Sequence, residues 1–214
     1  MIRLFSGLKN FSEFIYPKKQ HLFAKLVKGQ SPHTLFITCS DSRIDPSLIT
    51  QTEPGELFVI RNAGNLIPVH DGAGRGEEAA IEFALEGLGV ENIVVCGHSH
   101  CGAMEALSGK IDMTNFPSVK EWLKNASKTK KKMEQKKLST TTCSSSENVL
   151  VQVENLKTHP TVATRLAAGK LNIFGWVYDF TKGDVSFFHR DRKKFVSSKE
   201  FRGIGEKEIE SFSL

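Results

Sequence analysis

The sequence lacks any long apolar run. No window of the 214-residue chain approaches the roughly 20 consecutive apolar residues that a membrane-spanning helix needs. The opening residues, MIRLFSGLKNFSEF, also lack the continuous apolar core followed by small residues that is typical of a secretory signal peptide. We therefore expect a protein that makes no membrane contact and resides in the cytoplasm.

Cysteine is also scarce. The chain has four cysteines, at Cys39, Cys96, Cys101 and Cys143, which are too few for a disulfide framework in a chain of this length without an export signal. In a reducing compartment such residues remain thiols or bind a metal ion. This excludes a small scaffold held together by disulfides.

What remains is an ordinary globular composition. Hydrophobic residues make up 39% of the chain and charged residues 25%, unlike disordered or fibrous proteins. A chain of this length can bury most of its surface in one compact domain. We predict a single domain over residues 1–214, with an N-terminal helical arm over 1–25 and a C-terminal extension over 190–214.

The formal net charge of +5 is concentrated in one stretch. Six lysines lie between positions 128 and 137, next to a Ser/Thr-rich segment over 139–146. Because charge runs are usually solvated, we interpret 128–146 as a solvated, partly flexible surface segment. An electrostatic contact with a partner is the alternative. The lysines are Lys128, Lys130, Lys131, Lys132, Lys136 and Lys137.

Short apolar runs predict buried strands. They are Thr34–Thr38 (TLFIT), Glu56–Ile60 (ELFVI) and Asn92–Cys96 (NIVVC). Each run is apolar on both faces, as expected of strands inside a parallel sheet, and each stops at a polar loop. The later runs Leu171–Phe180 and Val185–Phe188 flank a Gly-containing turn and predict a hairpin.

Helical patterns lie between these strands. In the segment Glu77–Leu88, apolar residues recur at i, i+3, i+4 and i+7 from Ile81, which predicts an amphipathic helix. Residues Glu147–His159 and Pro160–Ala168 predict two more helices. Strands that alternate with helices indicate an α/β fold: a mostly parallel central β-sheet flanked by helices, with a C-terminal β-hairpin.

Two polar clusters follow strand ends. Cys39 comes directly after the first predicted strand, and His98 and Cys101 follow the third. Parallel neighbours would bring all three side chains to the same edge of the sheet, where ligands of open α/β sheets bind. Two sulfurs and one imidazole are typical zinc ligands. The sequence therefore predicts a single Zn²⁺ ion in each chain.

Asp41 and Arg43 lie next to the first of these ligands. Such a pair is commonly a loop salt bridge. In a zinc enzyme, however, the guanidinium would restrain the carboxylate near the metal and leave the fourth zinc position free for water. Structural zinc sites usually have four protein ligands, so three ligands with a nearby carboxylate favour a catalytic site.

Three motifs together resemble the signatures of the β-class carbonic anhydrase family. They are CSDSR at Cys39–Arg43, EPGELFVIRNAGN at Glu53–Asn65 and GHSHCGAM at Gly97–Met104. The similarity extends from about Gln30 to Phe188 and includes the helix Gly76–Leu88 and the segment Asn172–Phe180.

The resemblance implies an α/β dimer in which a zinc-bound hydroxide attacks carbon dioxide to give bicarbonate. By position, Cys39, His98 and Cys101 match the zinc ligands of the family. Asp41 and Arg43 match its catalytic dyad. A homodimer or a dimer of dimers is therefore expected.

The resemblance also implies a set of substrate-binding residues. Gln30 matches a glutamine that reaches into the partner subunit's site, although a surface loop residue is the other interpretation. Phe58 and Ala63 match an apolar wall around the substrate, and Gly102 matches a further substrate-binding position. Phe83 lies at a position where some members of the family carry a tyrosine. With phenylalanine there, this chain lacks the tyrosine hydroxyl near the site.

Other candidate residues receive no place among the metal ligands. We expect Cys96 to belong to the core and Cys143 to lie in the flexible Ser/Thr stretch. His100 neighbours the ligands at a variable position, where proton transfer is an open role. The remaining histidines have no partner spacing and receive no role. They are His21, His33, His70, His159 and His189.

Two alternative functions stay open. The same fold also supports hydrolysis of carbon disulfide or carbonyl sulfide. A zinc-stabilised binding module would instead use the lysine stretch to contact nucleic acid or an acidic partner, but that stretch lacks interleaved aromatic residues, and we expect no nucleic-acid partner.

The N-terminal segment is more apolar than a free tail and is expected to clasp a partner subunit. Its apolar residues are Leu4, Phe5, Leu8, Phe11, Phe14 and Ile15.

Overall fold

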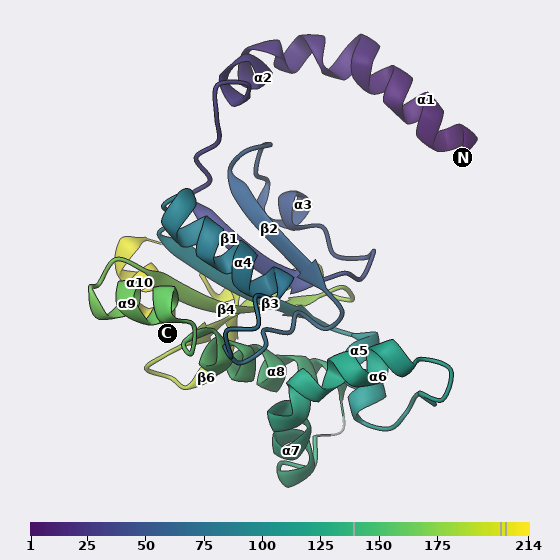
Figure 1. The fold of residues 1–214 in the computed structure, drawn as a ribbon, viewed down its shortest axis with the longest axis vertical. Helices are drawn as coiled ribbons and strands as arrows, with labels where there is room; N and C mark the ends of the chain where they lie inside the picture. The colour runs from purple at the N-terminus through teal and green to yellow at the C-terminus, as the bar shows by residue number, and fades with distance from the viewer. Residues whose placement is uncertain (139, 202, 204) are drawn as a thin grey trace. The chain divides into compact units, whose positions relative to one another are not determined.

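A computed structural model describes residues 1–138, 140–201, 203 and 205–214, which divide into the units 1–31 and 32–214. The first unit is helical, as predicted for residues 1–25 (purple in Figure 1). It contains α1 (Ile2–Asn10), the π-helical turn η1 (Phe11–Ile15), the 3₁₀ turn η2 (Pro17–Lys19) and α2 (Gln20–Leu26). The assignment of the whole chain to one domain stays a prediction.

The second unit is built on a six-stranded sheet with the order β2-β1-β3-β4-β5-β6. Its strands are β1 (Thr34–Cys39), β2 (Leu57–Asn62), β3 (Asn92–His98), β4 (Asn172–Asp179), β5 (Asp184–His189) and β6 (Lys194–Ser197). The first four strands are parallel, and β5 and β6 are antiparallel to their neighbours. The predicted α/β fold with a mostly parallel sheet and a C-terminal hairpin is confirmed.

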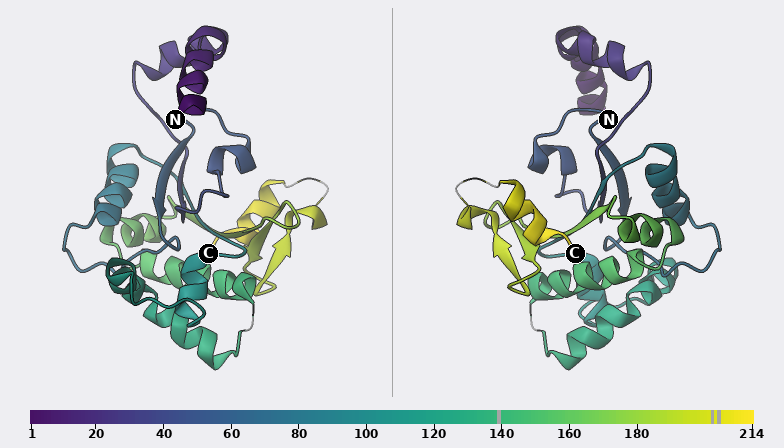
Figure 2. Two further views of the ribbon diagram at one scale, coloured as in Figure 1. Left: turned by 90° about the vertical axis from the view of Figure 1, so that its right-hand side faces the viewer. Right: turned by 90° about the vertical axis from the view of Figure 1, so that its left-hand side faces the viewer.

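Residues of the central strands are buried on both faces because side chains alternate between the two sides of a sheet. On one side, Leu35 of β1 and Ile93 of β3 belong to a core that includes residues of α4 (Gly76–Glu82), α8 (Thr141–Leu156) and α9 (Pro160–Ala167). On the other side, Phe36 and Val94 belong to a second core that includes Phe212 of α10 (Glu206–Phe212). Figure 2 shows α4 and the yellow C-terminal helix on opposite sides of the sheet.

The remaining elements lie in the segments that follow the strands. They are α3 (Pro46–Thr50), the π-helical turn η3 (Phe83–Gly87), α5 (Gly102–Leu107), α6 (Pro117–Trp122), the 3₁₀ turns η4 (Leu123–Ala126) and η5 (Ser198–Glu200), and α7 (Ser127–Gln135). The predicted helix Glu77–Leu88 is thus α4 continued by η3. No helix in the described parts of the chain has both the length and the apolar character needed to cross a bilayer.

The interpretation of 128–146 as a solvated, partly flexible surface segment missed two helices, because α7 and the start of α8 occupy the residues that the structure describes there; Ser139 lies outside the description. Thr129 and Met133 supply a buried face for α7, and the small side chains of Ser144 and Ser145 pack at the start of α8. Five of the six lysines are exposed, as predicted, whereas Lys132 is half-buried.

The C-terminal residues, whose structure the sequence did not predict, extend the hairpin. Strand β6 pairs with β5, and Ser213 forms an isolated bridge with Phe174 of β4. Phe212 is buried against the second core, with its ring centroid 5.4 Å from that of Phe187. An aromatic side chain buried this way explains why the tail folds back onto the sheet.

Two glycines allow α8 to approach the sheet. A Cβ atom at Gly97 of β3 would lie 3.0 Å from Cγ2 of Val149, and one at Gly175 of β4 would lie 3.0 Å from Cγ1 of the same valine. Both contacts are closer than a side chain normally tolerates. The glycines therefore set the distance between the sheet and α8, which carries residues that contact the loops described below.

We predict that Gly175→Val destabilises the fold by about 1–3 kcal/mol, because the added methyl groups overpack the sheet–helix interface. Urea unfolding followed by circular dichroism measures this. Gly76→Val is the matched control, since a Cβ at Gly76 meets nothing within 4 Å, and it should change stability by no more than about 0.5 kcal/mol. Equal stability of the two variants would contradict the packing account.

Candidate metal centre

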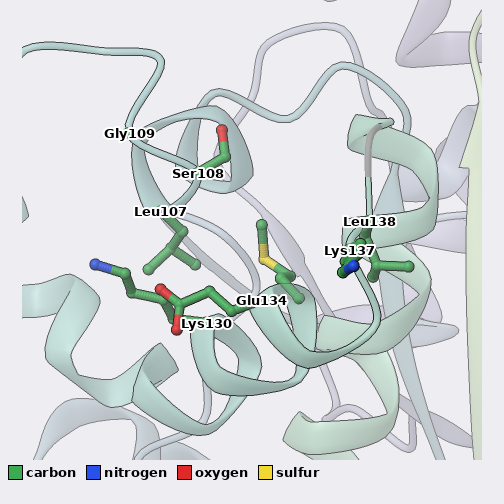
Figure 3. A pocket seen from close by; sticks show the side chains of 8 residues that line it. Leu107, Ser108, Gly109, Lys130, Glu134, Lys137 and Leu138 are labelled. Carbon is green, nitrogen blue, oxygen red and sulfur yellow. The ribbon is translucent and has the colours of Figure 1, made fainter.

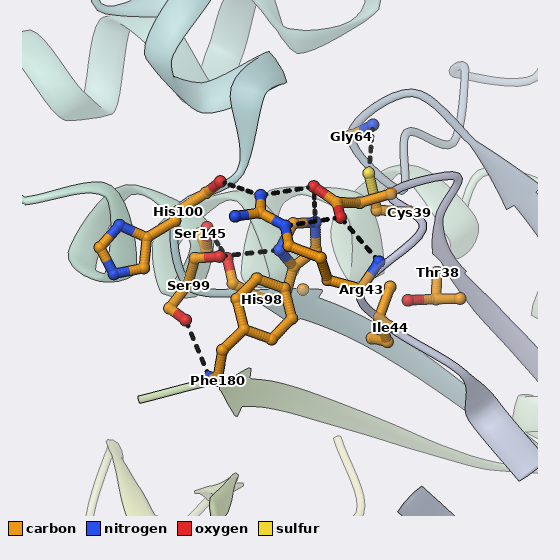
Figure 4. A network of polar contacts seen from close by, with 12 residues as sticks. Thr38, Cys39, Arg43, Ile44, Gly64, His98, Ser99, His100, Ser145 and Phe180 are labelled. Atoms are coloured by element: carbon orange, nitrogen blue, oxygen red, sulfur yellow. Dashed lines mark hydrogen bonds and ion pairs between the residues drawn. The ribbon is translucent and has the colours of Figure 1, made fainter. Parts of the chain in front are cut away.

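Three predicted ligands converge at the carboxyl edge of the sheet. Cys39 ends β1, His98 ends β3, and Cys101 precedes the first residue of α5. The parallel register pairs Thr38 with Cys96, so both strands end at the same edge. One ligand atom from each of the three residues lies within 4.8 Å of the others, and all three residues are buried. Figure 4 shows Cys39 and His98 of this cluster together with Arg43.

The imidazole of His98 has a defined tautomer. Its Nδ1 lies 2.8 Å from the carbonyl oxygen of Ser99, and because a carbonyl only accepts, Nδ1 carries the proton. In the neutral ring Nε2 then presents a lone pair, and this buried atom has no hydrogen-bond partner among the described residues. A buried, unpaired nitrogen is costly, whereas a metal ion would satisfy it. This geometry is typical of metal-binding histidines.

One of the two sulfurs, that of Cys39, is poised to lose its proton. Cys39 Sγ accepts a hydrogen bond from the backbone N–H of Gly64 at 3.3 Å. The pKa of Cys39 is lowered chiefly by a hydrogen bond from the Cys101 thiol, while that hydrogen bond, together with burial, raises the pKa of Cys101. Two sulfurs and an imidazole nitrogen at this spacing fit zinc, and they fit magnesium or calcium poorly because those ions prefer oxygen.

A carboxylate is held at the edge of this cluster. Arg43 binds Asp41 bidentately, with Nε 2.9 Å from Oδ1 and Nη2 2.7 Å from Oδ2. These hydrogen bonds hold the pKa of Asp41 well below its usual range, so the carboxylate is ionised. Its Oδ2 lies 4.0 Å from Nε2 of His98.

The arginine is itself fixed in place. Nη2 of Arg43 also donates to the carbonyl oxygen of His100 at 2.9 Å, and the guanidinium lies 4.7 Å from the centroid of the Phe180 ring. The same ring packs 5.1 Å from the ring of His98. Arg43 thus links the carboxylate of Asp41 to the loop between His98 and Cys101.

Arg61 is a residue to which the sequence analysis gave no role. Its guanidinium donates to the carbonyl oxygens of Cys39 at 3.1 Å, Asp41 at 2.7 Å and Ile44 at 3.0 Å. It therefore fixes the loop that carries the first ligand and the carboxylate. The sequence signal that could have identified Arg61 was its position near the end of the predicted strand, within the motif EPGELFVIRNAGN that also contains Ala63.

Two further contacts were not predictable from the motifs. The indole Nε1 of Trp122 donates to the carbonyl oxygen of Ala63 at 2.8 Å, and Nδ2 of Asn148 donates to that of Gly64 at 2.9 Å. Both contacts hold the loop after β2. In addition, Oγ of Ser145 donates to the carbonyl oxygen of His98 at 2.7 Å.

The predicted substrate-binding residues have varied positions. Ala63 belongs to the loop after β2, and Gly102 begins α5 beside Cys101. Phe58 is partly buried and pairs with Leu35 of β1. Leu35 precedes Cys39 by four residues in that strand. Gln30 belongs to the first unit, so its part in the site stays a prediction.

The remaining cysteines and histidines mostly lie where expected. Cys96 is fully buried in the core, and burial raises its pKa to about 12. Cys143 is exposed, but on α8 rather than in a flexible stretch. His70 and His159, which showed no partner spacing in the sequence, have ring centroids 5.4 Å apart, and Nε2 of buried His159 lies 3.1 Å from the carbonyl oxygen of Pro68.

A separate pocket of about 350 Å³ lies beside α5 and α7 (Figure 3). Its lining includes Leu107, Lys130 and Glu134, and it includes none of the residues predicted to bind metal or substrate. The pocket is therefore distinct from the metal cluster.

Comparison with known proteins identifies the family. The carbonic anhydrase family model matches residues 34–185. A carbonic anhydrase of Synechococcus elongatus is 50% identical to this chain, over 86% of this chain and 70% of its own length. A carbonic anhydrase of Pseudomonas aeruginosa is 41% identical, over 94% of this chain and 95% of its own length.

Solved structures agree with the curated relatives. The β-carbonic anhydrase CcaA superposes with a TM-score of 0.88 at 43% identity and covers 92% of this chain and 98% of its own. A structure from a study of two tetrameric β-carbonic anhydrases of Sordaria macrospora superposes with a TM-score of 0.77 at 27% identity. The match covers 86% of this chain and 94% of that structure's chain. As the motifs predicted, the chain belongs to the β-carbonic anhydrase family of enzymes.

Proposed function

We propose that the protein catalyses the reversible hydration of carbon dioxide to bicarbonate and a proton, with one Zn²⁺ held by Cys39, His98 and Cys101. The observation that carries this proposal is the cluster of one ligand atom from each of Cys39, His98 and Cys101 within 4.8 Å of one another. In that cluster, the buried Nε2 of His98 has no hydrogen-bond partner among the described residues. Family membership supports the reaction, and the sulfur–imidazole–sulfur donor set supports the metal.

When bound, zinc supplies the Lewis acidity that makes a water molecule acidic enough to lose its proton near neutral pH. The protein residues determine how that chemistry is used. As thiolates, Cys39 and Cys101 would balance the charge of the ion, and His98 would bind it through Nε2 because Ser99 accepts the Nδ1 proton.

Asp41 and Arg43 act as the catalytic pair in this proposal. The ionised carboxylate of Asp41 lies close enough to the cluster to accept a hydrogen bond from a reacting water. The bidentate contact from Arg43 restrains it from becoming a ligand itself. Arg43 therefore keeps the approach to the cluster open.

We assign substrate binding to Gln30, Phe58, Ala63 and Gly102. Carbon dioxide is apolar, so Phe58 and Ala63 suit a wall that excludes water from the reacting carbon. Gly102 has no side chain, and a Cβ there would meet nothing within 4 Å, which leaves space beside Cys101. The Gln30 amide would supply a hydrogen-bond donor from the partner subunit.

We propose a homodimer or a dimer of dimers located in the cytoplasm. In the first unit, Leu4, Phe5, Leu8 and Phe14 are each more than half exposed, more apolar surface than an isolated chain normally presents. The tetrameric relatives from Sordaria macrospora also support assembly.

Replacing Cys39 with Ser should abolish stoichiometric zinc binding, because a serine hydroxyl is a poor substitute for a thiolate ligand. Carbon dioxide hydration should fall by more than the roughly 10- to 100-fold that loss of an outer-shell partner costs. Elemental analysis of reduced, dialysed protein and stopped-flow hydration measure these effects.

The matched control is Cys143→Ser, which removes an exposed thiol from α8 and should leave zinc content and rate unchanged. A Cys39→Ser variant with wild-type zinc and rate would overturn the proposed function. Measuring the turnover of carbon disulfide and carbonyl sulfide with the same preparations identifies the preferred substrate. If either is turned over faster than carbon dioxide, that compound becomes the proposed substrate in place of carbon dioxide.

Replacing Arg43 with Lys should lower hydration by about 10- to 100-fold while zinc content stays unchanged. Lysine cannot reproduce the bidentate contact, so Asp41 would be free to rotate toward the cluster. Stopped-flow assays test this, with Arg165→Lys on α9 as the control for the same exchange at a distant site. Equal rates for the two variants would contradict the restraining role of Arg43.

Assembly is tested by Leu8→Glu. A charge on the exposed apolar face of α1 should shift the mass measured by light scattering toward that of the 23.8 kDa chain. Lys9→Glu serves as a control on the same helix, because Lys9 is already a charged, exposed residue. A monomeric wild-type protein would refute the proposed assembly.

A further inference from the structure

We propose that Trp122 and Asn148 are positioning residues that hold the backbone N–H of Gly64 against the sulfur of Cys39, and so limit the charge that this ligand donates to the metal. The inference rests on the zinc site proposed above. It concerns residues of α6 and α8 that lie outside the ligand motifs.

The key contact is the hydrogen bond from the Gly64 N–H to Cys39 Sγ. A hydrogen bond to a thiolate stabilises its lone pairs and weakens its donation to a metal. Partners of this kind, one step beyond the ligands, tune both metal affinity and the acidity at the site. A site with two thiolates needs such withdrawal, because each sulfur reduces the Lewis acidity of the ion.

Trp122 acts on the same peptide group. The N–H of Gly64 and the carbonyl of Ala63 belong to one peptide unit, and Nε1 of Trp122 donates to that carbonyl at 2.8 Å. A peptide that accepts at its oxygen becomes a better donor at its nitrogen, because hydrogen bonds in a chain polarise one another. The indole therefore both orients and strengthens the contact with Cys39.

Gly64 needs external restraint. Its φ angle is +82°, in the region that favours glycine, and a Cβ at this position would lie 2.9 Å from Cβ of Ala103. The residue must therefore be glycine, which has the most freely rotating backbone. Contacts on the two flanking carbonyl oxygens remove that freedom.

Asn148 supplies the second restraint, and its orientation is determined. The N–H of Ile67 donates to Oε1 of Gln152 at 2.7 Å, so Nε2 of Gln152 faces Oδ1 of Asn148, 3.0 Å away. Thr129 Oγ1 donates to the same Oδ1 at 2.9 Å. Asn148 Nδ2 must then point to the carbonyl of Gly64, 2.9 Å away.

These side chains are buried. Thr129, Asn148 and Gln152 are each 0% exposed, so water does not compete for their hydrogen bonds. A buried polar network of this kind holds one geometry when all its members are satisfied. The network therefore holds the loop after β2 in a single conformation next to Cys39.

The test uses the full-length protein loaded with cobalt(II), whose thiolate-to-metal charge-transfer absorption reports donation from sulfur. Trp122→Phe removes the indole donor and keeps an aromatic ring. Its charge-transfer band should move to lower energy, because a sulfur with a weaker hydrogen bond donates more charge to the metal. Trp176→Phe is the matched control, because Trp176 packs against Phe36 and Phe187 in the core.

Asn148→Ala is the second variant, which keeps the test decisive if Trp122→Phe does not fold. It should shift the band in the same direction. Ser144→Ala is its control, because Ser144 is also buried on α8 but its hydroxyl donates to the carbonyl of Thr140. Thermal melts separate loss of stability from the spectral effect.

The outcomes distinguish this inference from the proposed function. Wild-type protein that binds neither cobalt nor zinc would overturn both. Wild-type protein that binds metal, together with Trp122 and Asn148 variants whose bands match those of their controls, would overturn the positioning role alone. A lower-energy band in both variants and in neither control supports the inference.

Discussion

The parallel pairing of β1 with β3 is the constraint on which the site depends. The register that pairs Thr38 with Cys96 brings Cys39 and His98 to one edge of the sheet, and the short loop after β3 returns Cys101 to the same place. A slip of one residue would turn every side chain of the strand to the opposite face. The register is secured because both faces of these strands are buried in separate apolar cores.

Around this edge, each loop has an anchor on a different element. Arg61 at the end of β2 holds the loop that carries Asp41, Ser145 of α8 holds the carbonyl of His98, and Trp122 and Asn148 hold the loop at Gly64. The glycines of β3 and β4 bring α8 close enough to take part. The geometry of the cluster therefore belongs to the whole second unit, and mutations outside the motifs can alter its chemistry.

The strands, the clustering of Cys39, His98 and Cys101, and the contact between Asp41 and Arg43 were predictable because their signals are local: apolar runs, strand ends and short spacings. The anchors were not. Trp122 and Ala63 are 59 residues apart, and Asn148 and Gly64 are 84 apart, so only tertiary packing shows which carbonyl each donor meets. Residues 128–146 were misjudged because lysines and serines conceal the buried face that Thr129, Met133 and Ser145 form. Strand β6 and α10 were missed because a charged tail gives little periodicity.

The central claim is that two sulfurs and one imidazole hold a single zinc ion. Zinc K-edge X-ray absorption on the reduced, full-length protein tests it directly. The account predicts two sulfur scatterers at about 2.3 Å and a nitrogen at about 2.0–2.1 Å, with the imidazole outer-shell pattern of one histidine. A first shell of only nitrogen and oxygen, or of four sulfurs, would contradict it.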